Sequence, residues 1–419
     1  KEILLLIQFI LIIVIGFYLF DLYNPWVHYS NIPLQYRSLL GIFLIPILYI
    51  SYNYILTFYM QSFFQSRTIL LTSFLFIAPF IFISRFYFQK YLDPKRLKIR
   101  ILVICNLEIA EKFQHEINIR GGKWQIEYLL NEIPKEMNNS QNLSIYGTIQ
   151  EKFYTAIREQ WTAIVVAKKD LELEKEKIQI LFELKQKGVL VYDLIHFYEY
   201  YFFKIPLYYI DDYWFIQTKG FLIVESSTVM KLKRIVEVIF SLILALPILV
   251  FLPFILLIVY LSDGFPLIYK QERLGMNNKK FIAYKFRTMI KGSDKLDPYT
   301  REKDSRVTKI GNFLRKSRID EIPQIINVIK GDISLIGPRA EWTKLTEIYQ
   351  KVIPFYYYRH TIRPGLTGWA QVMYPYGASI EDTIQKLEYD LYYIKNYSFL
   401  LDISILIKTI RIVLFGRGR

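Results

Sequence analysis

Two acidic residues, Asp320 and Glu321, stand side by side in the stretch RIDEIPQ. Four arginines lie within twenty residues of them, at Arg306, Arg315, Arg318 and Arg339. A guanidinium group binds phosphate oxygens through two parallel hydrogen bonds. A carboxylate can attack phosphorus or help to hold a magnesium ion. The combination therefore favours chemistry on a phosphate or a diphosphate.

A short helix is expected to carry the two acids. Pro323 suits a first helical turn, and Gly331 suits a helix end, so the helix should run from about Asp320 to Lys330. A helix start favours carboxylates and phosphates, and neighbouring side chains point roughly 100° apart. One acid can then face the reacting phosphorus while the other holds a metal ion or a proton. Taken alone, the pair also fits a capping acid followed by an ordinary surface glutamate.

Further basic residues occur in short motifs that are weak signals individually. The predicted substrate-binding residues are Lys285 and Arg287 of KFRTM, Arg306, Arg315, Arg339 of IGPR and Arg363 of RPGLTGWAQV. The RPGLTGWAQV motif also offers a glycine-rich turn that a ligand could approach closely. The four histidines form no spaced cluster, so His360 is expected to be a packed or surface residue.

The composition indicates a membrane protein. Of 419 residues, 53% are hydrophobic and 17% aromatic, and the net charge is +15. This charge fits loops beside a bilayer and is compatible with anionic substrates. A nucleic-acid partner is not expected, because no helix-turn-helix or zinc pattern appears. The single cysteine, Cys105, excludes an internal disulfide framework and a cysteine-based zinc site.

Three uncharged or nearly uncharged stretches, 3–20, 38–60 and 68–84, are long enough to span a bilayer and predict a transmembrane region over 1–90. Basic residues follow the third stretch, which places that end in the cytoplasm by the positive-inside rule. The sequence begins with Lys1 rather than Met, and whether a further span precedes it is left open.

Residues 98–216 alternate short apolar runs with charged helical stretches, which predicts an α/β domain with a mostly parallel, Rossmann-like sheet. A dinucleotide-binding domain would carry a glycine-rich turn after its first strand. The corresponding turn reads ICNLEIAEKF and has no glycine. We therefore expect a degenerate domain with a regulatory or packing role.

The stretch 235–261 contains a single charge, Glu237, and two prolines, Pro247 and Pro253. Basic residues flank both of its ends, whereas a spanning helix should show a bias on one side. Proline kinks a helix. A kinked, re-entrant helix over 231–262 is therefore predicted, with a fourth span as the alternative. The remaining residues, 263–419, hold most polar motifs and end in an amphipathic segment suited to a membrane surface.

Taken together, the motifs KQERLG (270–275), KFRTM, the run 304–339 and RPGLTGWAQV strongly resemble the bacterial sugar transferase family. These are the monotopic phosphoglycosyl transferases, and the resemblance covers roughly 231–415. The front end and the α/β middle resemble the large members, which start exopolysaccharide or O-antigen synthesis.

The resemblance implies an α+β catalytic domain that a re-entrant helix anchors on the cytoplasmic side of the bacterial inner membrane, in a multi-pass protein. It implies transfer of a sugar 1-phosphate from a UDP-sugar to undecaprenyl phosphate, with release of UMP. Asp320 matches the family's nucleophile, and Glu321 matches the residue at the Mg²⁺ ion.

Three positions depart from the family pattern: Leu246 precedes Pro247 where serine is usual, Ala340 replaces a proline, and Glu237 replaces an aspartate. Two other functions stay open: a phosphatase or lipid phosphotransferase that uses another donor, and a non-catalytic scaffold or regulator of polysaccharide export. The sequence identifies no sugar, and it leaves a homo-oligomer open.

Overall fold

The structure is a computed structural model. It describes residues 83, 87, 99–120, 124–133, 143–168, 171–221, 228–293, 304–374, 377 and 379–414. The predicted spans 3–20, 38–60 and 68–84 lie outside the described residues, apart from Ile83. The chain divides into two compact units, Lys1–Phe197 and Tyr198–Arg419.

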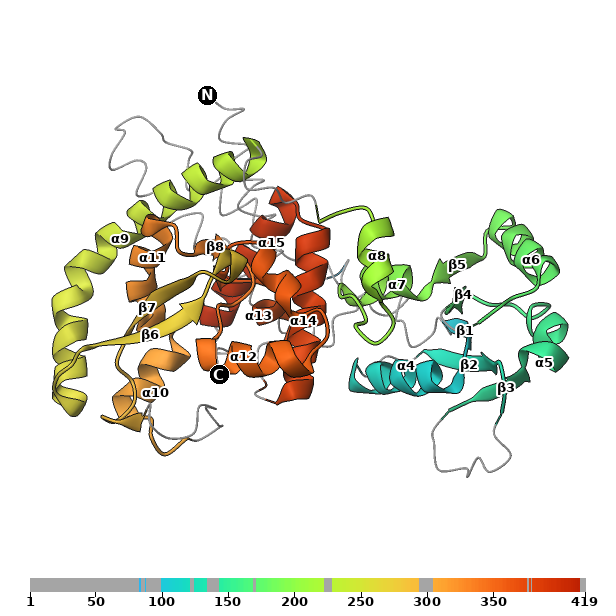
Figure 1. Cartoon of the computed structure of the whole chain (residues 1–419), viewed down its shortest axis with the longest axis horizontal. Coiled ribbons are helices and arrows are strands. Elements are labelled where there is room, and N and C mark those ends of the chain that lie inside the picture. Colours follow the sequence, from blue (N-terminus) through green and yellow to red (C-terminus); the bar gives the residue numbers. More distant parts are fainter. Residues whose placement is uncertain are drawn as a thin grey trace. The chain divides into compact units, whose positions relative to one another are not determined.

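The described part of the first unit is built on a five-stranded parallel sheet with the strand order β3-β2-β1-β4-β5. Its elements, in chain order, are β1 (Arg100–Cys105), α4 (Leu107–Arg120), β2 (Gln125–Leu130), β3 (Ile145–Thr148), α5 (Ile149–Ala156), β4 (Ala163–Val166), α6 (Lys175–Gln186), β5 (Leu190–Asp193) and α7 (Leu194–Phe197). This arrangement confirms the prediction of an α/β unit with a parallel sheet (Figure 1).

Helices cover both faces of this sheet. Leu102 and Ile104 of β1 pack with Phe153 of α5 and Leu181 of α6. On the other face, Phe113 of α4 contacts Tyr128 of β2 and Phe197 of α7. Parallel strands buried on both faces read as continuous apolar runs, which is why IRILVIC gave a clear strand signal.

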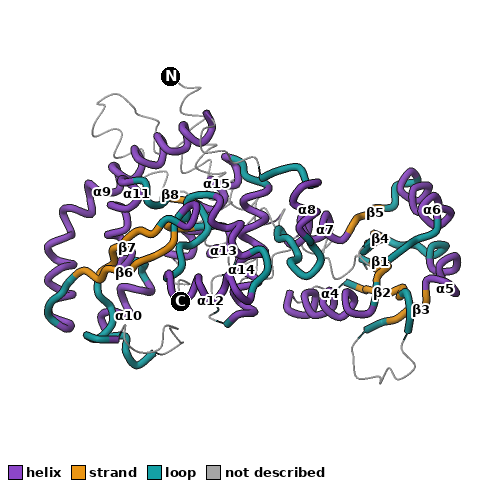
Figure 2. Tube along the Cα trace, in the orientation of Figure 1, coloured by secondary structure: helices purple, strands orange, loops and turns teal. Residues whose placement is uncertain are grey.

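The second unit combines one long helix, two small sheets and a cluster of shorter helices (Figures 1 and 2). Its elements begin with η1 (Tyr198–Phe202), α8 (Asp212–Gln217), α9 (Thr228–Asp263), β6 (Ile268–Leu274), η2 (Met276–Asn278) and β7 (Lys280–Phe286). They continue with α10 (Lys309–Lys316), η4 (Ile319–Gln324), α11 (Ile325–Lys330), β8 (Ser334–Ile336), α12 (Thr343–Val352), η5 (Tyr356–Thr361), β9 (Gly365–Thr367), α13 (Trp369–Met373), α14 (Ile380–Lys395) and α15 (Phe399–Leu414). Strands β6 and β7 pair antiparallel, and β8 and β9 pair parallel.

Helix α9 has 36 residues, and its segment Met230–Ser262 is long and apolar enough to cross a membrane. It contains Pro247 and Pro253, and it changes direction along its length (Figures 1 and 2). Near its start, Ser334 of β8 donates to Glu237 at 2.6 Å. Near its end, Ser262 donates to Thr308 at 3.0 Å, and Val259 packs with Phe286 and Leu314. Both ends of the helix therefore rest on the same unit.

The segment 198–221 packs within the second unit, although the sequence pattern grouped residues up to 216 with the sheet. Lys204 forms an ion pair with Glu388 of α14 at 2.7 Å, and both side chains are almost fully buried. The amide of Leu207 donates to the same carboxylate at 3.0 Å, and Trp369 donates to the carbonyl of Phe203 at 2.9 Å. These contacts join residues far apart in sequence, so no local sequence pattern predicts them.

Candidate active site

The acidic pair lies on η4, between α10 and α11. Thr308 caps α10 by accepting from the amide of Gly311 at 2.9 Å. A Cβ at Gly311 would come within 2.1 Å of the carbonyl oxygen of Thr288, so glycine is needed for this close approach to the chain after β7. Arg318 then takes a left-handed backbone conformation with φ of 58°, and the chain turns into the 3-10 helix Ile319–Gln324. Asp320 and Glu321 are both buried in this helix.

The next turn fixes η4 against the β6–β7 hairpin. Asn327 of α11 is fully buried, donates to the carbonyl of Ile282 at 2.7 Å and accepts from the amide of Tyr284 at 3.3 Å. Helix α11 ends at Gly331, which has φ of 94°. The predicted helix over Asp320–Lys330 is thus present, with its first part wound as a 3-10 helix.

Glu321 is held by basic side chains from three different elements. Its Oε1 accepts from Lys285 of β7 at 2.7 Å and from Arg339, after β8, at 2.7 Å. Its Oε2 faces Arg318 at 3.4 Å. Burial raises the pKa of Glu321, but the attraction of Arg339, Lys285 and Arg318 outweighs burial and holds that pKa well below its usual range. The surrounding basic side chains therefore favour the charged form of Glu321.

Asp320 has a different environment. Its Oδ1 is buried and has no hydrogen-bond partner among the described residues. Burial and the negative charge of Glu321 raise the pKa of Asp320, while Lys285, Arg315 and Arg318 pull that pKa down. A buried carboxylate oxygen without a partner costs free energy in the folded protein, which marks it as a group available to a ligand.

A second layer of charges holds Arg339 in place. Its Nη1 donates to Gln371 of α13 at 3.2 Å, and its carbonyl accepts from Arg359 at 2.9 Å. Arg359 is in turn paired with the buried Asp390 at 2.9 Å. Arg273 of β6 donates to the carbonyl of Ala340, next to Arg339. The arginine that clamps Glu321 is thus fixed on both its side chain and its backbone.

The structure brings only part of the predicted set together. Lys285 and Arg339 contact Glu321, and Arg315, whose Nε donates to Thr288 at 2.9 Å, interacts electrostatically with Asp320. Arg306 instead pairs with Asp304 at 2.5 Å. Burial lowers the pKa of Arg315, and the nearby charge of Arg306 also lowers it.

Two predicted residues point elsewhere. Arg287 donates to the carbonyl of Gly264, just beyond α9, at 2.7 Å. Arg363 lines a separate cavity at the start of α9. Sequence reasoning did not single out Arg273 and Gln371, and it noted Arg318 near the acids without assigning it to substrate binding. Arg273 and Gln371 stand in the quoted motifs KQERLG and RPGLTGWAQV, and those motifs were the signal that could have identified them.

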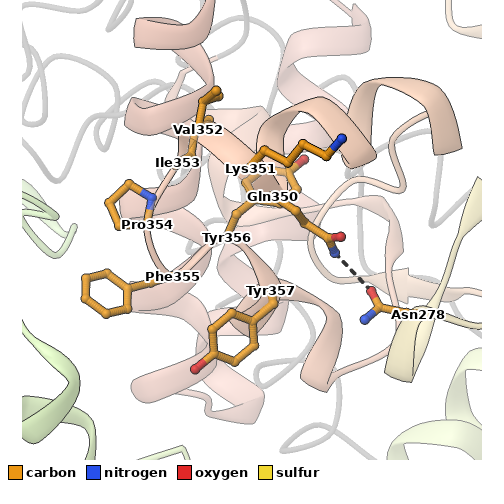
Figure 3. A pocket seen from close by; sticks show the side chains of 9 residues that line it. All are labelled: Asn278, Gln350, Lys351, Val352, Ile353, Pro354, Phe355, Tyr356 and Tyr357. Atoms are coloured by element: carbon orange, nitrogen blue, oxygen red, sulfur yellow. Dashed lines mark hydrogen bonds between the residues drawn. The ribbon is translucent and has the colours of Figure 1, made fainter.

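One cavity is not lined by the acidic pair. It has a volume of about 560 Å³ and is lined by Asn278 and by residues 350–357, between the end of α12 and the start of η5 (Figure 3). Figure 3 shows the hydrogen bond from Gln350 to Asn278, which measures 3.3 Å. None of the predicted catalytic or phosphate-binding residues lines it.

Comparison with known proteins connects this unit to one family. The model of the family described as "Bacterial sugar transferase" matches residues 228–416. A UDP-N-acetylgalactosamine-undecaprenyl-phosphate N-acetylgalactosaminephosphotransferase of Aeromonas hydrophila is 47% identical over 162 residues, which are 38% of this chain and 38% of that protein. A UDP-glucose:undecaprenyl-phosphate glucose-1-phosphate transferase of Escherichia coli (strain K12) is 40% identical over 184 residues, 43% of this chain and 39% of that protein.

The chain therefore spans about two fifths of the length of these two relatives. The uncharacterized sugar transferase EpsL of Bacillus subtilis (strain 168) is much more fully covered. It is 38% identical over 189 residues, which are 45% of this chain and 90% of that protein. The chain belongs to the bacterial sugar transferase family.

Proposed function

We propose that this protein transfers a sugar 1-phosphate from a UDP-sugar to undecaprenyl phosphate and releases UMP. The observation that carries the proposal is the buried Oδ1 of Asp320, which lacks a partner among the described residues and lies beside a glutamate clamped by basic side chains. The names of the relatives support the donor and acceptor classes. The sugar is not assigned.

In the proposed first step, a carboxylate oxygen of Asp320 attacks the phosphorus that carries the sugar. A bond forms between that oxygen and phosphorus, the bond from phosphorus to the bridging diphosphate oxygen breaks, and UMP leaves. In the second step, a phosphate oxygen of undecaprenyl phosphate attacks the same phosphorus and releases the Asp320 carboxylate. The covalent intermediate divides one transfer between two bulky partners into two displacements.

The other side chains position Glu321 and the substrate, and they neutralise the charge of the phosphate. Arg339 and Lys285 fix Glu321 and add positive charge beside the reacting phosphate, where electrostatics and positioning carry phosphoryl transfer. Arg315 places a further positive charge near Asp320. Gln371 holds Arg339 through its Oε1, and its buried Nε2, which has no partner in the described part of the chain, is a donor for a substrate oxygen.

These residues fit a magnesium ion that takes few protein ligands. The structure describes no group of three or more His, Cys, Asp or Glu side chains that could hold a metal. Magnesium often binds one or two carboxylates and completes its shell with phosphate oxygens and water. Glu321 would hold it through Oε2, whose contact among the described residues is Arg318. Magnesium bound there would neutralise charge on the diphosphate.

Helix α9 supports a membrane location for this chemistry. Most of its apolar side chains are exposed, including Leu246, Val250 and Phe254. Since both ends rest on the same unit, we propose that α9 enters the bilayer and returns, which places the site at the membrane surface where the lipid phosphate lies. The inner membrane, a multi-pass front end and a cytoplasmic site are part of this proposal. So is a place for the reaction in exopolysaccharide synthesis.

We also propose the domain limits given by the sequence pattern, 1–90, 98–216, 231–262 and 263–419, with residues 198–216 packed in the second unit.

Mass spectrometry of the full-length protein tests the proposal. The protein is incubated with magnesium and a panel of UDP-sugars, without the lipid acceptor. We expect UMP release of about one equivalent and a sugar-phosphate adduct on the peptide that contains Asp320. Added undecaprenyl phosphate should then discharge the adduct.

Two variants complete this test. Asp320→Asn should form no adduct, whereas Glu347→Gln, an exposed carboxylate on α12, should behave as the wild type. An adduct on Glu321, or normal UMP release by Asp320→Asn, would contradict the proposed mechanism. UMP release that begins only when undecaprenyl phosphate is added, with no adduct beforehand, would favour direct transfer.

A further inference from the structure

The cavity drawn in Figure 3 lies within the second unit, where the end of α12 meets η5 and the turn between β6 and β7. Its volume of about 560 Å³ falls in the range of small-ligand sites, roughly 300–1,000 Å³. Its lining contains neither Asp320 nor Glu321. Tyr356, in its wall, is buried, and the hydroxyl of Tyr356 accepts from the buried Arg359 at 2.6 Å. The cavity is therefore distinct from the proposed reaction centre.

An aromatic surface forms part of the lining. Tyr357 is stacked on Tyr358, with ring centroids 4.2 Å apart, and Tyr358 is stacked on Phe215, with centroids 3.9 Å apart. One face of the Tyr357 ring is thus covered, whereas 49% of the residue remains exposed. The ring of Phe355, which also lines the cavity, contacts Phe215 with centroids 5.2 Å apart. Because further rings support it from behind, Tyr357 is a fixed platform with an open face.

Two amide side chains, Asn278 and Gln350, line the same cavity (Figure 3). The Oδ1 of Asn278 accepts from Gln350 at 3.3 Å and lies 2.6 Å from the Nδ1 of His360. Burial, together with the charge of Arg359, lowers the pKa of His360 to about 3, so its ring is neutral. Since an amide oxygen only accepts, the Nδ1 of His360 carries the proton. Both acceptor positions of Oδ1 are then filled, and the side chain of Asn278 is held in one orientation.

This arrangement leaves polar groups available to a ligand. The Nδ2 of Asn278 and the Oε1 of Gln350 have no hydrogen-bond partner among the described residues, and both side chains are exposed. An amide nitrogen carries two N–H donors, and an amide oxygen is an acceptor. The cavity therefore offers donors and an acceptor together with an open aromatic face.

The charge of the lining separates the classes of ligand. Lys351 is the only charged residue among the described lining residues, so the several phosphate charges of a nucleotide would meet a single cation. An entirely apolar ligand would leave the amide groups without partners. A neutral pyranose ring has a face of C–H bonds, which packs on an aromatic ring, and hydroxyl groups at its edge, which donate and accept. Its chemistry matches both parts of the lining.

We propose that this cavity binds a neutral pyranose of a saccharide that carries no nucleotide, stacked on Tyr357 and hydrogen-bonded to Asn278 and Gln350. The bound pyranose is not the one transferred at Asp320, because Asp320 does not line the cavity. The site is an addition to the proposed transfer reaction and does not depend on it.

Saturation-transfer NMR on the full-length protein tests this site. The protein is kept in a detergent without sugar head groups, and the methyl glycosides of glucose, galactose, N-acetylglucosamine and N-acetylgalactosamine are added one at a time. At least one glycoside should receive saturation from the protein, most strongly at the C–H protons of one ring face. Tyr357→Ala should weaken its binding about tenfold, because the aromatic platform is lost. Tyr357→Phe keeps the ring and should bind as the wild type does.

Two controls locate the bound sugar. Tyr213→Ala removes an exposed tyrosine of α8 that does not line the cavity, and this variant should bind the glycoside as the wild type does. Added UDP should not displace the glycoside, since a UDP-sugar is proposed to bind beside Asp320.

Three results would overturn the proposal: no saturation transfer to any of the four glycosides, unchanged binding by Tyr357→Ala, or displacement of the glycoside by UDP. The last would assign the sugar to the donor site. If Tyr357→Ala has a lower melting temperature than the wild type, Gln350→Ala, near the exposed end of α12, decides by the same criteria. UMP release is measured on the same samples, so a protein that binds the glycoside but shows no turnover would refute the proposed function and leave this site standing.

Discussion

Asp320 and Glu321 are neighbours in sequence and have opposite electrostatic environments. Arg339, Lys285 and Arg318 surround Glu321 and keep it charged, whereas Asp320 is buried beside that charge and its Oδ1 has no partner among the described residues. Carboxylate pairs in active sites divide their roles in this way, because their surroundings push their pKa values apart. We infer that Glu321 holds the site in shape and that Asp320 is the group held ready to react.

The stability of an Asp320→Asn variant tests this division. The folded state raises the pKa of Asp320, so its favourable contribution is complete below the unfolded pKa and is lost as pH rises through the folded pKa. Charging this side chain therefore costs folding free energy, and the neutral, nearly isosteric asparagine should keep or raise the melting temperature. UMP release should fall by about a thousandfold or more, since an amide is a poor nucleophile. A melting temperature several degrees below that of the wild type would show that Asp320 is structural.

The pH dependence of turnover should report Lys285. Burial lowers the pKa of Lys285 to about 8, against the attraction of Glu321. As pH rises through that value, Lys285 loses its charge and with it the ion pair to Glu321, so kcat/KM for UMP release should fall above about pH 8. Lys285→Arg keeps the charge at high pH. The pH above which kcat/KM falls should therefore rise by at least one pH unit. Lys279→Arg, which changes an exposed lysine, should leave that pH unchanged.

The sequence predicted the centre of this site better than its edges. The adjacent acids, Lys285 and Arg339 were identifiable because each stands in a dense motif with its own turn or strand signal. Arg287, Arg306 and Arg363 stand in motifs of the same kind, yet their side chains lie toward α9, Asp304 and the cavity at the start of α9. Whether an arginine faces the acids depends on how separate elements pack, and spacing along the chain does not contain that information.

At the scale of elements, α9 decides how the catalytic unit meets the membrane. Two prolines remove hydrogen bonds within it, and each end is fastened to the globular part by its own contacts. A straight helix of this length would reach about 54 Å at 1.5 Å per residue, far more than a bilayer core requires. Sequence alone predicted the kink and the basic flanks. The fastening of both ends could not be predicted, because it depends on Ser334 and Thr308, more than forty residues away.

Cysteine labelling in intact cells tests the path of α9. Single cysteines replace Lys231 and Lys270, two exposed residues on either side of the apolar segment, in a chain with Cys105→Ala. Cys105 is buried, and alanine fits its apolar surroundings. Neither position should react with a membrane-impermeant maleimide from outside, and both should react after the membrane is opened. Labelling of one position from outside would show that α9 crosses the bilayer.

The turn between β1 and α4 predicts that the sheet unit does not bind a dinucleotide. In this turn Asn106 accepts from the amide of Ile109 at 2.9 Å, and no glycine is available for a close approach by a pyrophosphate. Calorimetry on the full-length protein should therefore show no heat of binding for NAD. A UDP-sugar should give heat that Arg339→Ala reduces by at least tenfold, since its site lies in the second unit. A micromolar NAD site would contradict this interpretation of the turn.

At the scale of the whole molecule, the sheet unit and the catalytic unit are joined through 198–221, which packs with the catalytic unit. The family match begins at residue 228, beyond this segment, and EpsL is covered over 90% of its length by a match of 189 residues. The segment thus lies outside the residues that the family model matches. Its buried contacts to α14 make it an integral layer of the second unit rather than a free linker.

The ion pair between Lys204 and Glu388 tests that conclusion. Breaking a buried pair by removing one partner leaves a charge without compensation and costs about 3–5 kcal/mol. Lys204→Met should lower the unfolding free energy of the full-length protein by about that amount, and proteolysis within 198–221 should become faster.

A second substitution separates the effect of the unpaired charge on stability from the effect of lost packing. Adding Glu388→Gln should recover much of the loss, because glutamine carries no charge and still accepts from the amide of Leu207. Lys219→Met, an exposed lysine of the same segment, should change neither quantity. If Lys204→Met behaves like Lys219→Met, the segment 198–221 is only loosely attached to the rest of the second unit.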